Sequence, residues 1–193
     1  MKKLIVLLLT VAIAVTCAAC GGSSDAGTTT AATTTIAATT TTAPAPTYTA
    51  EEIAAAIREA YGENYLSNAP IPEEMLTDMF GMDLDSYESY VAEMPMIGFH
   101  PDRVIVVAAK DEASADATEE AFNAARDTLI NDSMQYPANI AKINAAQVLR
   151  NGNYVVFLLA GAPDDVTSDE EAAAEFAKEQ TQIGVDAFNA LFA

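Results

Sequence analysis

Apolar residues recur with helical spacing in two segments that lie far apart in the chain. Residues 49–52, TAEE, have the spacing of a capping box, in which the Thr49 hydroxyl and the Glu52 carboxylate each accept a hydrogen bond from the other residue's amide. An apolar face then continues to Tyr61, and Gly62 is a typical C-terminal stop. Residues 168–171, SDEE, have the spacing of a second capping box, and an apolar stripe with helical spacing follows them as far as Leu191. The pattern predicts an amphipathic helix in each segment.

Two more helices are predicted between these segments. Pro72 precedes the sequence EEML, and a Pro in the first turn favours a short helix, which should end near Gly81. The Ala-rich stretch from about Glu112 to Gln135 carries a buried stripe with helical spacing. Pro137 interrupts this stretch, because Pro removes a helical hydrogen bond. We therefore expect a long helix with a break or a kink.

Two strands are predicted between the short and the long helix. Residues 87–94, YESYVAEM, partly alternate between polar and apolar, as in a strand with one buried face. Residues 103–109, RVIVVAA, form the strongest strand signal of the chain, a β-branched run that is too apolar for an exposed face. This second strand should lie at the centre of a sheet.

A β-hairpin is predicted in residues 147–161, QVLRNGNYVVFLLAG. Two apolar runs flank Asn151-Gly152, the pair that best tolerates the positive φ angles of a type I′ turn. The resulting order is helix, helix, strand, strand, helix, strand, strand, helix. This order predicts a single α+β domain over residues 49–193, with helices packed on one face of a mostly antiparallel sheet of about four strands.

The first twenty residues, MKKLIVLLLTVAIAVTCAAC, have the pattern of an export signal. Two Lys precede an apolar run that is too short to span a membrane comfortably. Small residues then flank Cys20, and this arrangement resembles the lipobox of bacterial lipoproteins. The resemblance implies that residues 1–19 are a signal peptide and that Cys20 is the lipidated first residue of the mature chain. The alternative is an uncleaved anchor helix or a plain secretory signal, with Cys20 incidental.

Residues 20–48 are predicted to be a disordered tether. After Cys20 they consist almost entirely of Thr, Ala, Gly, Ser and Pro, and such a composition buries too little apolar surface to offset the entropy of ordering. A coil of about 27 residues would average roughly 30 Å between its ends. The tether would hold the domain off the outer face of the cytoplasmic membrane, with O-glycosylation of the Thr residues as an alternative role.

Charge and cysteine content narrow the classes of function. The 193 residues include 28 acidic and 9 basic side chains, which gives a net charge of -19. Nucleic-acid binding is excluded, because binding to phosphates requires clustered Lys and Arg. Both cysteines lie in the N-terminal segment, so the predicted domain has no disulfide and depends on core packing for its stability.

Four stretches carry a resemblance to a known family. They are residues 87–98 (YESYVAEMPMIG), 102–111 (DRVIVVAAKD), Tyr136 and residues 150–157 (RNGNYVVF). Residues 51–165 thereby resemble an uncharacterised family of small bacterial lipoproteins, mainly from Gram-positive organisms, known as domain-of-unknown-function family 4358. The resemblance implies an extracytoplasmic lipid-anchored protein and carries no established activity.

The residues offer little catalytic chemistry. His100 is the only histidine, in a predicted loop between strands, and a turn role is favoured over that of a general base. A zinc site would need more His and Cys ligands than the domain contains. Calcium could use Asp83 and Asp85, or Asp164 and Asp165 with Asp169, but caps and turns explain Asp at these positions better. We predict no catalytic, cofactor-binding or metal-binding residue.

Five methionines form a loose cluster along the chain, which could line an adaptable apolar groove or, more simply, pack the core beneath the second helix: Met75, Met79, Met82, Met94 and Met96. The sequence favours a non-enzymatic, membrane-tethered module that binds or organises an envelope polymer or a protein partner. The alternative is an extracytoplasmic enzyme, or enzyme accessory, that acts on an envelope polymer. A pocket of converging polar groups would favour the enzyme, and an exposed apolar or acidic patch the binding module.

Overall fold

Five antiparallel strands lie at the centre of the domain, in the order β1-β2-β3-β5-β4. The computed structural model describes residues 48–98, 100–132, 134–164 and 169–193, so the predicted signal, Cys20 and nearly all of the predicted tether lie outside the described residues. The strands are β1 (Ala69–Pro70), β2 (Tyr87–Met94), β3 (Arg103–Ala109), β4 (Gln147–Asn151) and β5 (Tyr154–Leu159). The predicted α+β class and antiparallel sheet are confirmed.

The fifth strand, β1, was not predicted, since two residues are too short to show an alternating pattern. It pairs with the end of β2, and the Ile71 amide donates to the Ala92 carbonyl at 2.9 Å. The other strands agree closely with the prediction. In particular, β3 pairs with β2 on one side and with β5 on the other, which makes it the central strand.

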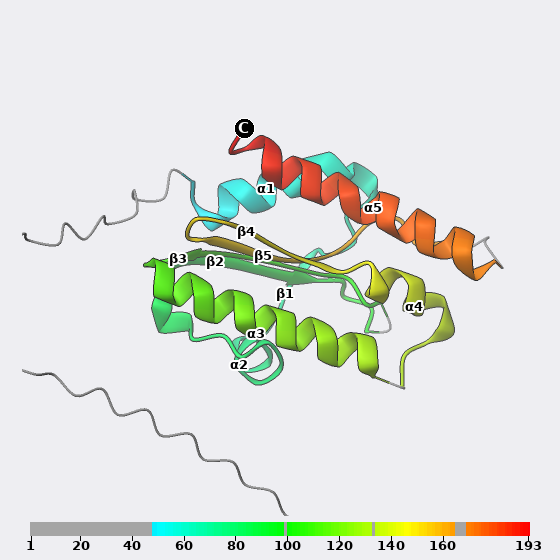
Figure 1. Ribbon diagram of the computed structural model, residues 1–193, viewed down its shortest axis with the longest axis horizontal. Helices are drawn as coiled ribbons and strands as arrows, with labels where there is room; N and C mark the ends of the chain where they lie inside the picture. Colours follow the sequence, from blue (N-terminus) through cyan, green and yellow to red (C-terminus); the bar gives the residue numbers. More distant parts are fainter. Residues whose placement is uncertain (1–47, 99, 133, 165–168) are drawn as a thin grey trace, which may run out of the picture. The chain divides into compact units, whose positions relative to one another are not determined.

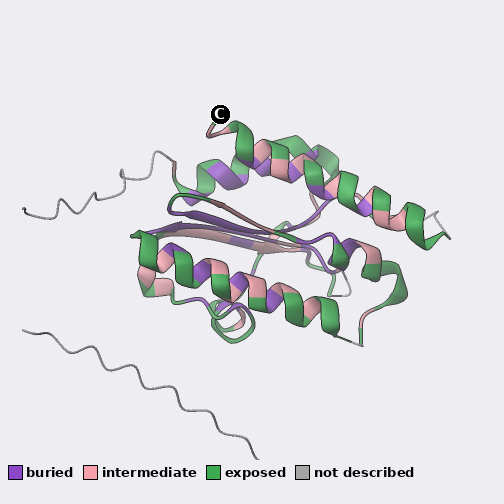
Figure 2. Ribbon diagram, viewed as in Figure 1, coloured by how far each residue is buried: buried purple, intermediate pink, exposed green. Residues whose placement is uncertain are grey.

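Helices cover both faces of the sheet, so the prediction of helices on one face was wrong (Figure 1). The physical reason lies in β3 and β5, because successive side chains of a strand point to opposite faces of the sheet. Almost all residues of these two strands are buried (Figure 2). Val104 and Val106 belong to one core, and Ile105 and Val107 to the other. A strand without a polar face needs cover on both sides.

One layer consists of α1 (Ala50–Tyr61) and α5 (Glu170–Ala190). Both halves of the predicted capping box at Thr49 are present, and α1 ends at Gly62 as predicted. The two helices pack against each other, and Gly184 of α5 lies so close to Tyr61 that an added Cβ would be 2.8 Å from the phenol oxygen. The N-cap of α5 is Asp169, which accepts from the Ala172 amide, rather than the predicted Ser168, which lies outside the described residues.

The opposite layer consists of α2 (Glu73–Phe80) and α3 (Glu112–Asn131). The prediction for α2 is confirmed, including its end at Gly81, which has φ of +63°. Three aromatic rings tie this layer to the sheet: Phe80, Phe122 and Phe157 have centroids 5.2–6.4 Å apart and meet edge to face.

The predicted long helix ends earlier than expected, at Asn131, and a separate helix, α4 (Pro137–Asn144), follows it. Pro137 occupies the first turn of α4, where its missing N–H costs no helical hydrogen bond. Pro137 thus begins a helix, whereas we had expected it only to interrupt one. α4 contacts both α3 and α5.

The β4–β5 hairpin is confirmed, but its turn is displaced by one residue. Asn151 pairs with Tyr154, so the two loop residues are Gly152 and Asn153 and not the predicted Asn151-Gly152. Gly152 has φ of +55°, as a tight hairpin turn of this kind requires. Short 3-10 helices at Gly62–Asn64 and Leu84–Ser86 complete the described elements. None of the described helices combines the length and the apolar character needed to cross a membrane.

Candidate functional site

A groove of about 540 Å³ lies in the layer that contains α2 and α3. Its walls come from the end of α2, the C-terminal part of α3, the segment that joins α3 to α4, and the loop between β2 and β3. We call it the α2–α4 groove. Four segments from distant parts of the sequence therefore meet around one depression.

Exposed apolar side chains are concentrated on the segments that form this groove. Met79, Met134 and Tyr136 line it, with exposed fractions of 53%, 85% and 63%. The other exposed large apolar residues of the described part belong to the same four segments or to α4 itself: Met96, Ile97, Ile130 and Ile140. Single exposed apolar residues are ordinary, but a concentration around one groove marks an interaction surface.

At the end of α2, one apolar side chain is buried in the core and its neighbour is exposed. Phe80 is buried against the rings of Phe122 and Phe157, whereas its neighbour Met79 faces the groove. The helix stops at Gly81, whose left-handed conformation turns the chain away at this point. Met79 is thus held at the groove wall by the packing of the residue beside it.

Hydrogen bonds fix the segment that joins α3 to α4. One carboxylate oxygen of Asp132 accepts from the Met134 amide at 2.9 Å, and the other accepts from the Gln135 side chain at 3.1 Å. Tyr136 is the N-cap residue of α4, and its carbonyl accepts from the Asn139 amide at 2.8 Å. These bonds hold Met134 and Tyr136 at the surface, although both are apolar enough to be buried elsewhere.

Arg103 supports the wall that the β2–β3 loop forms. Its Nη1 donates to the carbonyl of His100 at 3.1 Å and to that of Asp102 at 2.6 Å. Burial lowers the pKa of the Arg103 guanidinium from its ordinary value, and the nearby Asp102 carboxylate opposes that shift. The guanidinium stays charged, and its role in the loop is to bind two carbonyls.

A buried ion pair fastens α4 next to this wall. Lys142 Nζ donates to Asp102 Oδ1 at 2.6 Å and to the Gly161 carbonyl at 2.8 Å. Asp102 is fully buried, and its Oδ2 has no hydrogen-bond partner among the described residues. Burial raises the pKa of the Asp102 carboxyl, and the Lys142 ammonium opposes that shift. Sequence reasoning missed this pair, because a Lys on an undetected helix gives no sign of its partner.

His100 lies in the β2–β3 loop as predicted, and it lines the groove. Sequence reasoning gave no reason to place it beside Met79 and Tyr136, which are distant in the chain. The methionine cluster divides between its two interpretations. Met75, Met82 and Met94 pack in or against the core, whereas Met79 lines the groove and Met96 is exposed.

Two of the acidic residues considered for calcium have other roles in the structure. Asp83 accepts from the Ser86 hydroxyl at 2.7 Å, and Asp169 caps α5. Asp165 lies outside the described residues. Among the described residues, no group of three or more His, Cys, Asp or Glu side chains is arranged to hold a metal ion.

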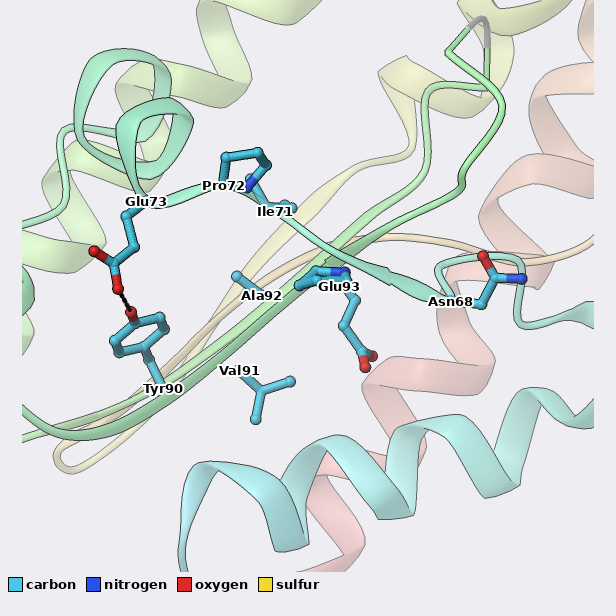
Figure 3. A pocket seen from close by; sticks show the side chains of 9 residues that line it. Asn68, Ile71, Pro72, Glu73, Tyr90, Val91, Ala92 and Glu93 are labelled. Carbon is cyan, nitrogen blue, oxygen red and sulfur yellow. Dashed lines mark hydrogen bonds between the residues drawn. The ribbon is translucent and has the colours of Figure 1, made fainter.

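A second depression, of about 480 Å³, lies beside β1 and β2 (Figure 3). Tyr90 donates to Glu73 at 3.2 Å across one side of it. Glu93 points toward α1, where Arg58 binds both of its oxygens at 3.0 Å and Tyr65 donates to it at 2.6 Å. Arg58, Tyr65 and Tyr90 thus engage the carboxylates of this depression, and none of the exposed large apolar residues lines it. The α2–α4 groove is therefore the stronger candidate for a binding site.

Comparison with known proteins identifies the family and no individual relative. No curated protein and no solved structure matches the chain. Residues 60–160, which span the whole sheet together with α2, α3 and α4, match the family described as a domain of unknown function, DUF4358. All four stretches that carry the resemblance lie within this region. The chain belongs to the DUF4358 family.

Proposed function

We propose that this protein is a lipid-anchored binding module of the bacterial cell envelope, whose α2–α4 groove docks a partner outside the cytoplasmic membrane. The observation that carries the proposal is the concentration of exposed Met, Tyr and Ile side chains around one groove. Leaving such side chains in water costs about 25 cal/mol for each Å² of apolar surface that a partner could cover. A docked partner would remove that cost.

The anchoring part of the proposal rests on the N-terminal sequence. Two Lys, a short apolar run and small residues before Cys20 are the features of a lipoprotein signal. Cys20→Ser should block lipidation and move the protein from the membrane fraction to the medium, or leave it as an uncleaved precursor. Normal processing with unchanged membrane retention would contradict a lipid anchor at Cys20.

Site-specific photocrosslinking in intact cells tests the docking part. A photoreactive phenylalanine at the position of Met134 should give one discrete adduct, because Met134 is the most exposed of the large apolar residues that line the groove. The matched control places the same group at Glu179, an exposed position on α5. Adducts of equal yield at both positions, or none at Met134, would mean that the groove is not a docking surface.

A second candidate function is an extracytoplasmic enzyme that acts on an envelope polymer. One observation favours it: His100, the only histidine of the chain, lines the same groove as Asp78 and Asp132. A His and a carboxylate can act as general acid and base when both reach the substrate. Replacement of His100 separates the two functions, because a binding groove does not need its proton chemistry.

A further inference from the structure

The charges at the groove indicate what kind of partner it takes. Asp78 and Asp132 line the groove and are exposed. The only cation that lines it from the described residues is Arg103, whose Nη1 is engaged by two backbone carbonyls of the β2–β3 loop. The groove therefore presents an apolar surface with an acidic rim.

The charge of the whole chain has the same sign. The net charge is -19, and the isoelectric point is near 4.1. Such a field raises the encounter rate with cationic partners and repels anionic ones. An anionic lipid surface or an acidic protein segment would therefore be disfavoured at this groove.

The apolar residues favour a helical segment over a small ligand. The groove is open, and the exposed Met side chains beside it can adapt to the shape of a partner because they are flexible and polarisable. An amphipathic helix meets such a surface with residues at i, i+3, i+4 and i+7. Its polar face would then lie beside the acidic rim.

Resting on the proposed docking function, we infer that the occupant of the α2–α4 groove is a basic amphipathic helical segment of a partner protein. Its apolar stripe packs on Met79, Met134 and Tyr136, and its Lys or Arg side chains lie beside Asp78 and Asp132.

Defined peptides test this inference with the full-length protein carrying Cys20→Ser. The probe is a peptide of about four helical turns, with Leu at i, i+3, i+4 and i+7 and Lys elsewhere. One control replaces every Lys by Glu, and another scrambles the sequence so that Leu surrounds the helix. The Lys peptide should bind, with an affinity that falls as salt is added, and both controls should bind far more weakly.

Variants of the groove locate the binding site. Met79→Ser with Met134→Ser should weaken binding by about tenfold or more, since central apolar contacts dominate interface energies. Asp78→Asn and Asp132→Asn should each weaken it by about two- to fivefold, the effect of one exposed charge pair. Asp132→Asn keeps one side-chain oxygen to accept from the Met134 amide, whereas Asp78→Asn changes no hydrogen bond described for this segment and is the cleaner test of charge. Glu179→Gln removes one negative charge from α5, which lies in the opposite helical layer and does not line the groove, and should change the affinity by less than either Asp variant.

Three results would overturn the inference. The first is equal binding of the Lys and Glu peptides, and the second is an equal effect of Glu179→Gln and the Asp variants. The third is binding of phosphatidylglycerol vesicles in place of the Lys peptide, if the double Met variant abolishes that binding and so places it at the groove rather than at the N-terminal apolar run. If the Lys peptide fails while crosslinking at Met134 succeeds, the basic helix is wrong and the docking function stands. If both fail, the docking function is wrong as well.

Discussion

The two helical layers on the sheet differ in how completely they bury their own apolar residues. In the α1 and α5 layer, the described helices have no exposed large apolar side chain. Phe188 of α5 packs on Phe192, which follows the helix and packs on Tyr154 of the sheet. The α2 and α3 layer has an equally well-packed core around Phe80, Phe122 and Phe157. Together with α4 and the adjoining loops, it nevertheless carries every exposed large apolar residue of the described part.

The exposed residues are therefore not a necessary consequence of packing helices on this sheet. Both layers pack on the same sheet, and the α1 and α5 layer shows that helices can pack there without exposing large apolar side chains. The family match covers the open layer, because residues 60–160 contain α2, α3 and α4 but exclude α5 and most of α1. All residues that line the groove lie within the matched range.

Loss of the Lys142 ammonium should give the largest effect on stability. Lys142→Met leaves the fully buried Asp102 carboxylate without its partner, which should lower the free energy of unfolding by about 3–5 kcal/mol. The double variant with Asp102→Asn removes both charges and should recover much of this loss. Urea unfolding of both variants at pH 7 measures the difference. Equal losses would show that the pair contributes packing rather than charge compensation.

The deficit of Lys142→Met should also depend on pH. Burial raises the pKa of Asp102 in the folded protein above its unfolded value of 3.8, and removal of the ammonium raises this pKa further. Between the two pKa values the folded state binds more protons, so stability falls as the pH rises through this window. The deficit should therefore shrink as the pH is lowered toward 4. The double variant lacks this carboxyl and should show no such recovery relative to the wild type.

Two neighbouring positions on α2 sharpen the contrast between core and groove. Leu76 is fully buried, and Leu76→Ala should cost about 2–5 kcal/mol, as is usual for a core cavity. Met79 is half exposed, and Met79→Ala should change the free energy of unfolding by no more than about 0.5 kcal/mol. Thermal and urea unfolding test both. A large loss for Met79→Ala would mean that this residue serves the fold, which would weaken the groove as a docking surface.

The turn between β4 and β5 lies outside both helical layers. A substitution there should therefore lower the free energy of unfolding by less than a cavity in the core does. Gly152→Val should destabilise the domain by on the order of 1–3 kcal/mol, because a β-branched residue resists a φ of +55°. Nothing lies within 4 Å of an added Cβ, so the cost comes from the backbone alone. Gly152→Asn is the matched control and should cost less, since Asn tolerates this conformation. Equal melting temperatures for Val and wild type would contradict this turn geometry.

The core was easier to predict from the sequence than the groove, because the core elements have local sequence patterns and the groove does not. The run in β3 and the box at Thr49 are local patterns, so the chain order displays them directly. The same apolar run has no polar face and therefore also implies helices on both faces of the sheet, although only one covered face was predicted. The groove joins Met79, His100 and Tyr136 from three segments, and no local pattern encodes such proximity. β1 was missed because two residues show no periodicity, and α4 was missed because Pro137 was expected to interrupt a helix rather than to begin one.

The smallest effect is expected at His100, and it decides between the two proposed functions. His100→Gln should change the free energy of unfolding by no more than about 0.5 kcal/mol, because the residue lies in a loop at the wall of an open groove. A binding groove keeps its apolar surface and its acidic rim in this variant, so crosslinking from Met134 and complementation of a deletion strain should both persist. An enzyme that used His100 as general acid or base would lose roughly two to four orders of magnitude in rate. Failure to complement, at unchanged stability and abundance, would therefore favour the enzyme and make the β2–β3 loop its active site.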